Sequence, residues 1–210
     1  MAKRSAPEVN AGSMADIAFL LLIFFLVTTD IAVDSGLSRK LPPSEENQDD
    51  IVIKQKNILA LKVNANKQWF VKAGEDEKLI ELKDLRALAV KFLDNGGGTG
   101  PDACKRCRGA KDPKSSDNFQ KAIISLSNDR LTKYKTYIAV QNEILAAYNE
   151  LRNREFKREY PKLGMNFVEA NDKYQDAQTK PKEKEDLKEK LEAIKLLVPQ
   201  KFSEAETKNI

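Results

Sequence analysis

The sequence predicts an α+β protein in which one apolar segment near the N-terminus precedes a small mixed domain. Two observations favour this class. One apolar stretch stands out in a chain whose mean hydropathy is −0.54. The polar remainder contains both alternating apolar patterns, which are typical of strands, and apolar repeats at helical spacing. Strands and helices mixed in this way favour helices packed on one sheet.

The apolar segment runs over 11–33 and contains two charged residues, Asp16 and Asp30. Roughly 20 helical residues at about 1.5 Å of rise each cross the hydrocarbon core of a bilayer. The free energy of inserting its Leu, Ile, Phe and Val side chains exceeds the cost of one aspartate. We therefore expect a single transmembrane helix over 11–33, preceded by a tail over 1–10. A cleaved signal peptide is one alternative, although no small-residue cleavage site follows the apolar core. A buried helix of a soluble domain is the other.

Asp16 is the first candidate for a functional residue. An ionisable side chain within a membrane span faces protein or water and marks an ion pathway by default. Desolvation disfavours a charged carboxylate, which suits a carrier of protons. Helical spacing places Asp30 and Asp34 on the same side as Asp16. Asp30 and Asp34 are candidates for an accessory role, or they mark the point where the helix leaves the membrane. The alternative for Asp16 is a position at the water interface or at the start of the helix, where it would act as a cap.

The residues after the span divide into a linker and a folded domain. Polar residues and a Pro-Pro pair over 34–55 predict an extended linker. The alternating Lys and Glu residues over 180–195 predict a helix with a solvated face. The domain itself is expected over 56–210, with strands over 59–63, 68–72 and 122–126. Helices are expected over 80–94, from residue 137 to a point before Pro161, and from residue 187 to Pro199.

A glycine- and cysteine-rich insertion over 95–118 separates the first of these helices from the third strand. Its glycine run lacks the Gly-Lys-Ser/Thr ending of a phosphate-binding loop. Cys104 and Cys107 are the only cysteines, and they supply half of a four-ligand zinc site that no histidine completes. A local disulfide is the favoured prediction, and a disulfide between two chains or free thiols are the alternatives. We expect neither a metal nor catalysis here.

The composition excludes several classes of function. The chain has no histidine, which excludes a His general base, Ser–His and Cys–His dyads, and His metal sites. A formal net charge of +4 over 210 residues is too small to indicate nucleic-acid binding. We therefore expect a protein that is not an enzyme and that uses no cofactor.

The N-terminal residues resemble a known family. The stretch Val9–Thr28 is similar to the start of ExbD/TolR proteins, which have an asparagine shortly before a membrane aspartate, an aliphatic run and a Val-Thr near its end. Leu41 and Pro42 resemble the Leu-Pro that these proteins carry just past the membrane, where it would contribute to partner contacts of the linker. Further matches to the family's periplasmic domain are Asp129, Arg130, Tyr134 and the run Tyr148–Arg152.

This resemblance implies a single-pass subunit of a proton-driven motor in the bacterial inner membrane. The N-terminus would be cytoplasmic and the folded domain periplasmic. Asp16 would take up and release protons as they cross the membrane beside an ExbB/TolQ-like channel subunit. Other implied partners are a second copy of the chain and a TonB-like protein that energises outer-membrane transport. The alternatives are a TolR-like role in envelope maintenance, with peptidoglycan as a partner, and a secreted periplasmic binding protein.

Overall fold

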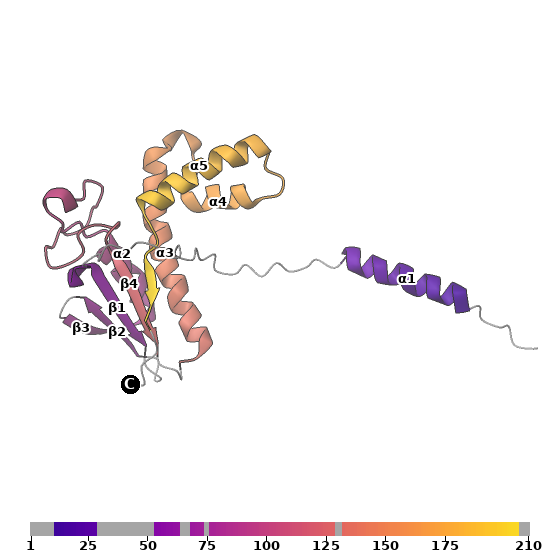
Figure 1. Cartoon of the computed structure of the whole chain (residues 1–210), viewed down its shortest axis with the longest axis horizontal. Helices are drawn as coiled ribbons and strands as arrows, with labels where there is room; N and C mark the ends of the chain where they lie inside the picture. Colours follow the sequence, from indigo (N-terminus) through magenta and orange to yellow (C-terminus); the bar gives the residue numbers. More distant parts are fainter. Residues whose placement is uncertain (1–10, 29–52, 64–67, 74–75, 129–131, 206–210) are drawn as a thin grey trace, which may run out of the picture. The chain divides into compact units, whose positions relative to one another are not determined.

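The computed structural model describes residues 11–28, 53–63, 68–73, 76–128 and 132–205 (Figure 1). The chain divides into two units, one on each side of the boundary between residues 49 and 50. The first unit contributes one described helix, α1 (Ala11–Thr28). The second contains a sheet and four helices among its described residues. The predicted α+β class is therefore confirmed for the domain.

Helix α1 is apolar around its whole circumference between Ile17 and Val27. Leu, Ile and Phe follow one another there without a helix-breaking residue, and its large side chains are exposed within this unit. In its last turn the Thr28 hydroxyl donates a hydrogen bond to the Phe24 carbonyl at 2.7 Å. The predicted span extends to residue 33, and residues 29–33 lie outside the described part of the chain. Among the described helices, none combines the length and hydropathy needed to cross a bilayer.

The domain is built on one mixed five-stranded sheet with the order β3-β2-β1-β4-β5. β1 is the central strand, because it pairs antiparallel with β2 and parallel with β4. β3 extends the sheet antiparallel to β2, and β5 extends it parallel to β4. The strands are β1 (Ile58–Val63), β2 (Trp69–Ala73), β3 (Asp76–Ile80), β4 (Ile123–Asn128) and β5 (Phe202–Glu204).

One face of the sheet is covered by two helices, α2 (Leu82–Leu93) and α3 (Tyr134–Glu159). Alternation along β1 places Leu59, Leu61 and Val63 on this face, where each is at most 3% exposed. The register sets Leu61 between residues of β2 and β4 that are also buried. The main core therefore lies between this face and the two helices.

A second, smaller core lies at the C-terminal part of α3. Figure 1 shows α4 (Phe167–Gln175) and α5 (Pro181–Leu197) as a pair of helices beside that part of α3. Phe156 of α3 is fully buried there and makes edge-to-face contacts with the rings of Tyr160 and Phe167. The other buried members of this second core are Ala170, Leu187, Leu191 and Ile194.

The observed elements confirm the predicted ones, several with shifted ends. The three predicted strands are β1, β2 and β4, and the three predicted helices are α2, α3 and α5. The predicted helix over 80–94 begins too early, because Ile80 ends β3 and α2 starts at Leu82. β3, α4 and β5 were not predicted. The solvated face expected for α5 is confirmed, since only Leu187, Leu191 and Ile194 of that helix are buried.

Candidate functional site

The predicted site residues are only partly within the described chain. Asp16 lies in the second turn of α1 and is exposed in that unit. Because α1 is helical as far as Thr28, Asp16 lies on one side of the helix with Leu20, Ile23 and Val27. The remaining membrane-proximal candidates, Asp30, Asp34, Leu41 and Pro42, lie outside the described residues.

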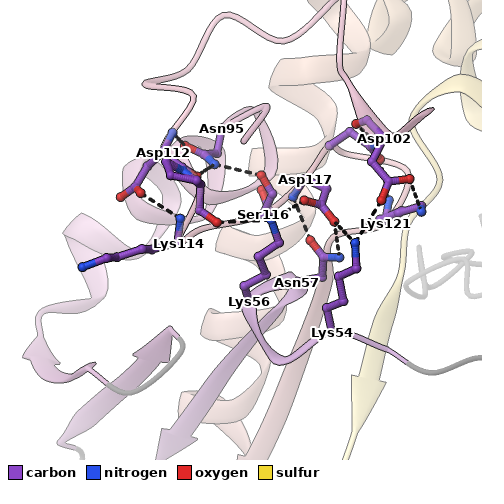
Figure 2. Close-up of polar contacts among 12 residues, drawn as sticks. Lys54, Lys56, Asn57, Asn95, Asp102, Asp112, Lys114, Ser116, Asp117 and Lys121 are labelled. Atoms are coloured by element: carbon purple, nitrogen blue, oxygen red, sulfur yellow. Dashed lines mark hydrogen bonds and ion pairs between the residues drawn. The ribbon is translucent and has the colours of Figure 1, made fainter. Parts of the chain in front are cut away.

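The domain has a charged cluster where the chain enters it after the predicted linker. We name this group the linker-exit cluster (Figure 2), and its members are Lys54, Lys56, Asn57, Asp102, Asp117 and Lys121. The parallel pairing of β1 and β4 explains why it forms. Parallel strands begin at the same edge of a sheet, so the residues before β1 meet the residues before β4.

Asn57 and Asp117 are the buried centre of this cluster, at 3% and 1% exposed. The Asn57 side-chain amide donates to the Asp117 carboxylate at 3.0 Å, and the Asp117 backbone N–H donates to Asn57 Oδ1 at 2.7 Å. Lys56 adds an ion pair to Asp117 at 2.5 Å and donates to the Pro113 carbonyl at 3.1 Å. Lys56 and Asn57, the two residues that directly precede β1, are thus both bonded to residues of the insertion.

Two lysines extend the cluster around Asp102. Lys54 lies 3.1 Å from the Asp102 carboxylate and 3.7 Å from that of Asp117, and Lys121 pairs with Asp102 as well. These lysines lower the pKa of Asp102 below its ordinary value, the hydrogen bond from Lys121 having the largest effect. Burial opposes ionisation of Asp117, but its hydrogen bonds and the charges of Lys56 and Lys54 outweigh burial and lower its pKa. Both carboxylates are therefore held in the charged form.

The insertion is packed closely against the end of α2. Asn95 follows that helix and is 3% exposed. Its side-chain amide donates to the carbonyls of Asp112 and Ser116 at 2.8 Å, and its Oδ1 accepts from the Asp112 N–H at 3.0 Å. Gly97 lies so close to the backbone of Asp112 that a Cβ atom on residue 97 would overlap the Asp112 carbonyl oxygen. The glycine run is therefore a place of close backbone approach.

The two cysteines form a disulfide within this insertion. Cys104 and Cys107 are bridged, with their Cα atoms 5.4 Å apart. Cys107 is 7% exposed and belongs to the main core, and Cys104 packs against it with partial exposure. The backbone N–H of Cys107 donates to Cys104 Sγ at 3.0 Å. Of the three predicted alternatives for these cysteines, the structure has the local bridge.

Salt bridges join α3 to the end of α2 and to the insertion. Arg154 binds both carboxylate oxygens of Asp94, at 2.5 and 2.8 Å. Glu155 is fully buried and accepts from Arg154 Nε at 3.1 Å and from Arg106 Nη1 at 3.3 Å. Arg106 also pairs with Glu159. Because Arg106 lies between the two cysteines, the disulfide-closed segment is fixed to the helix that carries the second core.

The charged groups described above anchor the insertion to the sheet and to α3. No set of three or more His, Cys, Asp or Glu side chains in the described part of the chain is arranged to hold a metal ion. The linker-exit cluster was not predicted from the sequence, because its centre joins residues that are 60 positions apart. The local signal available was two lysines and an asparagine placed directly before a strand.

Comparison with protein families matches residues 2–152 to the family described as biopolymer transport protein ExbD/TolR. The match includes α1, the linker-exit cluster and the insertion, and it ends within α3, before α4 and α5. A comparison with curated proteins gave no match. Because the family match covers most of the chain, from the residues before α1 to the middle of α3, this chain belongs to the ExbD/TolR family.

Proposed function

We propose that this chain is the single-pass inner-membrane subunit of a proton-driven motor that energises TonB-dependent transport across the outer membrane. The ExbD/TolR family consists of non-enzymatic biopolymer transport proteins that work with ExbB/TolQ and TonB/TolA partners. In this proposal residues 11–33 span the membrane, the first ten residues are cytoplasmic and the domain over 56–210 is periplasmic.

The observation that carries the proposal is the position of Asp16 in α1. It is the one ionisable side chain of this helix, and it precedes the exposed apolar surface between Ile17 and Val27. A lone carboxylate in such a segment requires a protein or water environment when the segment is in a bilayer. A multi-spanning channel partner supplies that environment, and a second copy of the chain would add a second carboxylate. Asp16 is accordingly the proton-coupling residue.

The linker-exit cluster supports a transmitting role for the domain. Motion of the membrane segment reaches the domain through the residues that precede β1. The paired charges of Lys54, Lys56, Asp102 and Asp117 join that point to the insertion, and Arg106 bonds the insertion to α3. The linker thus enters the domain at the start of the central strand, where ion pairs stabilise the fold. A stable attachment of this kind is suited to passing mechanical work to a TonB-like partner.

The test replaces Asp16 with asparagine in the full chain, co-expressed with its ExbB-like channel partner. Asp16→Asn keeps the size of the side chain but cannot exchange a proton. We expect normal co-purification with the channel subunit and loss of both proton flux in proteoliposomes and energised uptake in cells. Asp30→Asn is the matched control and should keep most of the activity. Full uptake by an assembled Asp16→Asn complex would refute the proposal.

A second readout separates the TonB-linked role from a TolR-like one. Cells that carry Asp16→Asn should lose uptake of substrates of TonB-dependent transporters while their outer membrane stays intact. The opposite pattern, intact uptake with a leaky envelope and binding of the domain to peptidoglycan, would assign the chain to envelope maintenance instead.

A further inference from the structure

The disulfide of the insertion has one accessible and one enclosed sulfur. Cys107 is 7% exposed and contributes to the main core, whereas Cys104 is partly exposed beside it. An external thiol therefore reaches Cys104 before it reaches Cys107. Thiol–disulfide exchange proceeds by attack of a thiolate on one sulfur, so such an asymmetry decides which mixed disulfide forms.

The geometry around Cys104 favours its thiolate. The backbone N–H of Cys107 points at Cys104 Sγ, with a distance of 3.0 Å between nitrogen and sulfur. A hydrogen bond to the charged form of a group favours that form. Cys107 has no corresponding donor among the hydrogen bonds of the described residues. The two cysteines thus differ in solvent exposure and in hydrogen bonding, because Cys104 is the more exposed one and its sulfur accepts the Cys107 N–H.

The charged residues between and directly after the two cysteines, Lys105, Arg106 and Arg108, are all basic. Carboxylates of this region are paired with cations: Arg154 with Asp94, Arg106 with Glu155 and Glu159, and Lys54 and Lys121 with Asp102. Arginine and lysine side chains next to a cysteine lower the pKa of its thiol. The charged groups of the insertion are Asp102, Lys105, Arg106, Arg108, Lys111, Asp112, Lys114 and Asp117. Those of the neighbouring elements that pair with or bond to the insertion are Lys54, Lys56, Asp94, Lys121, Glu155 and Glu159, and Arg154 and Arg158 pair with Asp94 or Glu155 in turn.

We propose that Cys104 and Cys107 form a thiol–disulfide exchange site for a periplasmic dithiol, in addition to holding the insertion together. A thiolate of the dithiol attacks Cys104 Sγ, a mixed disulfide forms, and the sulfur of Cys107 leaves and takes up a proton. The second thiol of the dithiol then displaces Cys104 as a thiolate. The protein disulfide gains two electrons, and the dithiol is oxidised to its own disulfide.

Exchange at this site changes how the insertion is attached to α3. Arg106 lies between the two cysteines and pairs with Glu155 and Glu159. Opening the bridge frees the segment that holds Arg106, so its ion pairs to α3 become weaker. The redox state of Cys104 and Cys107 is thereby linked to the part of the domain that contacts the second core. This inference rests on the periplasmic location of the domain in the proposed function, but not on proton coupling at Asp16.

The first experiment measures thiol reactivity in single-cysteine variants of the full chain in detergent. Cys107→Ser leaves Cys104 alone and keeps the backbone N–H of residue 107, and Cys104→Ser is the matched control. An ordinary thiol with a pKa of about 8.5 loses roughly fiftyfold in alkylation rate between pH 8.5 and pH 6.5. We expect a loss of less than about fivefold for Cys104. We expect the ordinary loss, or almost no reaction, for Cys107.

Further variants identify the source of the effect. Arg108→Gln should increase the pH-dependent loss in rate at Cys104 at least twofold, whereas Lys188→Gln, on the exposed face of α5, should leave it unchanged. Where a variant fails to fold, the wild-type chain reduced by dithiothreitol gives the same comparison, because mass spectrometry distinguishes the two alkylated cysteines.

The second experiment equilibrates the oxidised wild-type chain with millimolar glutathione buffers of different ratio. An exchange site becomes half reduced within the range that these buffers span, and a purely structural disulfide stays oxidised throughout. A Cys104 rate that falls more than twentyfold between pH 8.5 and pH 6.5 would overturn the proposal. A bridge that resists every glutathione ratio would overturn it as well.

Discussion

Asn57 and Asp117 bind each other reciprocally across 60 residues of sequence. The Asn57 amide donates to the Asp117 carboxylate at 3.0 Å, and the Asp117 N–H donates to the Asn57 side-chain oxygen at 2.7 Å. Both residues are almost fully buried, so neither can exchange its partner for water. The pair connects the residue before β1 with the residues before β4, and the stability of this edge of the sheet depends on it.

Removing one partner of this pair should destabilise the domain. Asp117→Ala leaves the buried Asn57 amide without its acceptor and removes the counter-charge of Lys56. The cost of an unsatisfied buried polar group together with a lost charged bond is about 2–4 kcal/mol. Trp69 is the only tryptophan and packs against the main core, so its fluorescence during urea unfolding of the full chain in detergent reports the change. Asp112→Ala, at an exposed carboxylate, is the control and should cost much less.

The contribution of Asp117 should depend on pH. Its pKa is lowered in the folded protein from an ordinary value of 3.8, so the ionised carboxylate favours folding above that value. This stabilisation is lost as the pH falls from 3.8 towards the lower pKa of the folded state. The difference in unfolding free energy between the wild-type chain and Asp117→Asn should therefore be larger at about pH 6 than at about pH 3. An equal difference at both pH values would contradict the assignment.

Two glycines of the insertion should respond to alanine for different reasons. A Cβ on Gly97 would overlap the Asp112 carbonyl, whereas a Cβ on Gly100 would meet no atom within 4 Å. Gly100 instead has a φ of +60°, which costs an L-residue about 1–2 kcal/mol. We expect Gly97→Ala to lower the unfolding free energy by more than Gly100→Ala and to slow formation of the disulfide during oxidative refolding. The order of the two effects is the test.

The second core should open independently of the sheet. Phe156→Ala removes a fully buried ring that contacts Tyr160 and Phe167, and such a change typically costs about 3–5 kcal/mol. Hydrogen exchange should then become faster in α4 and α5, while β1 and β4 stay protected. Leu196→Ala, at a side chain that is 79% exposed, should change neither region. Equal loss of protection in β1 would show that the two cores unfold together.

The sequence predicted the elements whose apolar pattern is strong. The alternation at Leu59, Leu61 and Val63 indicates β1, and the apolar repeat from Leu82 to Leu93 indicates α2, because each pattern matches one buried face. β3 was not predicted, because it is an edge strand in which Asp76, Glu77 and Lys78 break the apolar pattern. β5 has only three residues, which is too few for a pattern to be recognised.

The short helix α4 did have a local signal that the apolar pattern did not reveal. Asn166 accepts from the Glu169 N–H at 3.0 Å, and the Glu169 side chain accepts from the Asn166 N–H at 2.7 Å. This capping box is an Asn followed three residues later by Glu, which is visible in the sequence. The linker-exit cluster had no such signal. Its lysines and aspartates look like ordinary surface charges until the parallel pairing of β1 and β4 brings them together.

The central place of β1 has a mechanical consequence. Because β1 is bonded to β2 along one edge and to β4 along the other, a pull on the chain along the axis of this strand loads two ladders at the same time. Their hydrogen bonds then resist in shear and share the load, whereas an edge strand such as β3 or β5 loads a single ladder when it is pulled in the same way. The strand that follows the linker is thus held in the sheet more firmly than either edge strand.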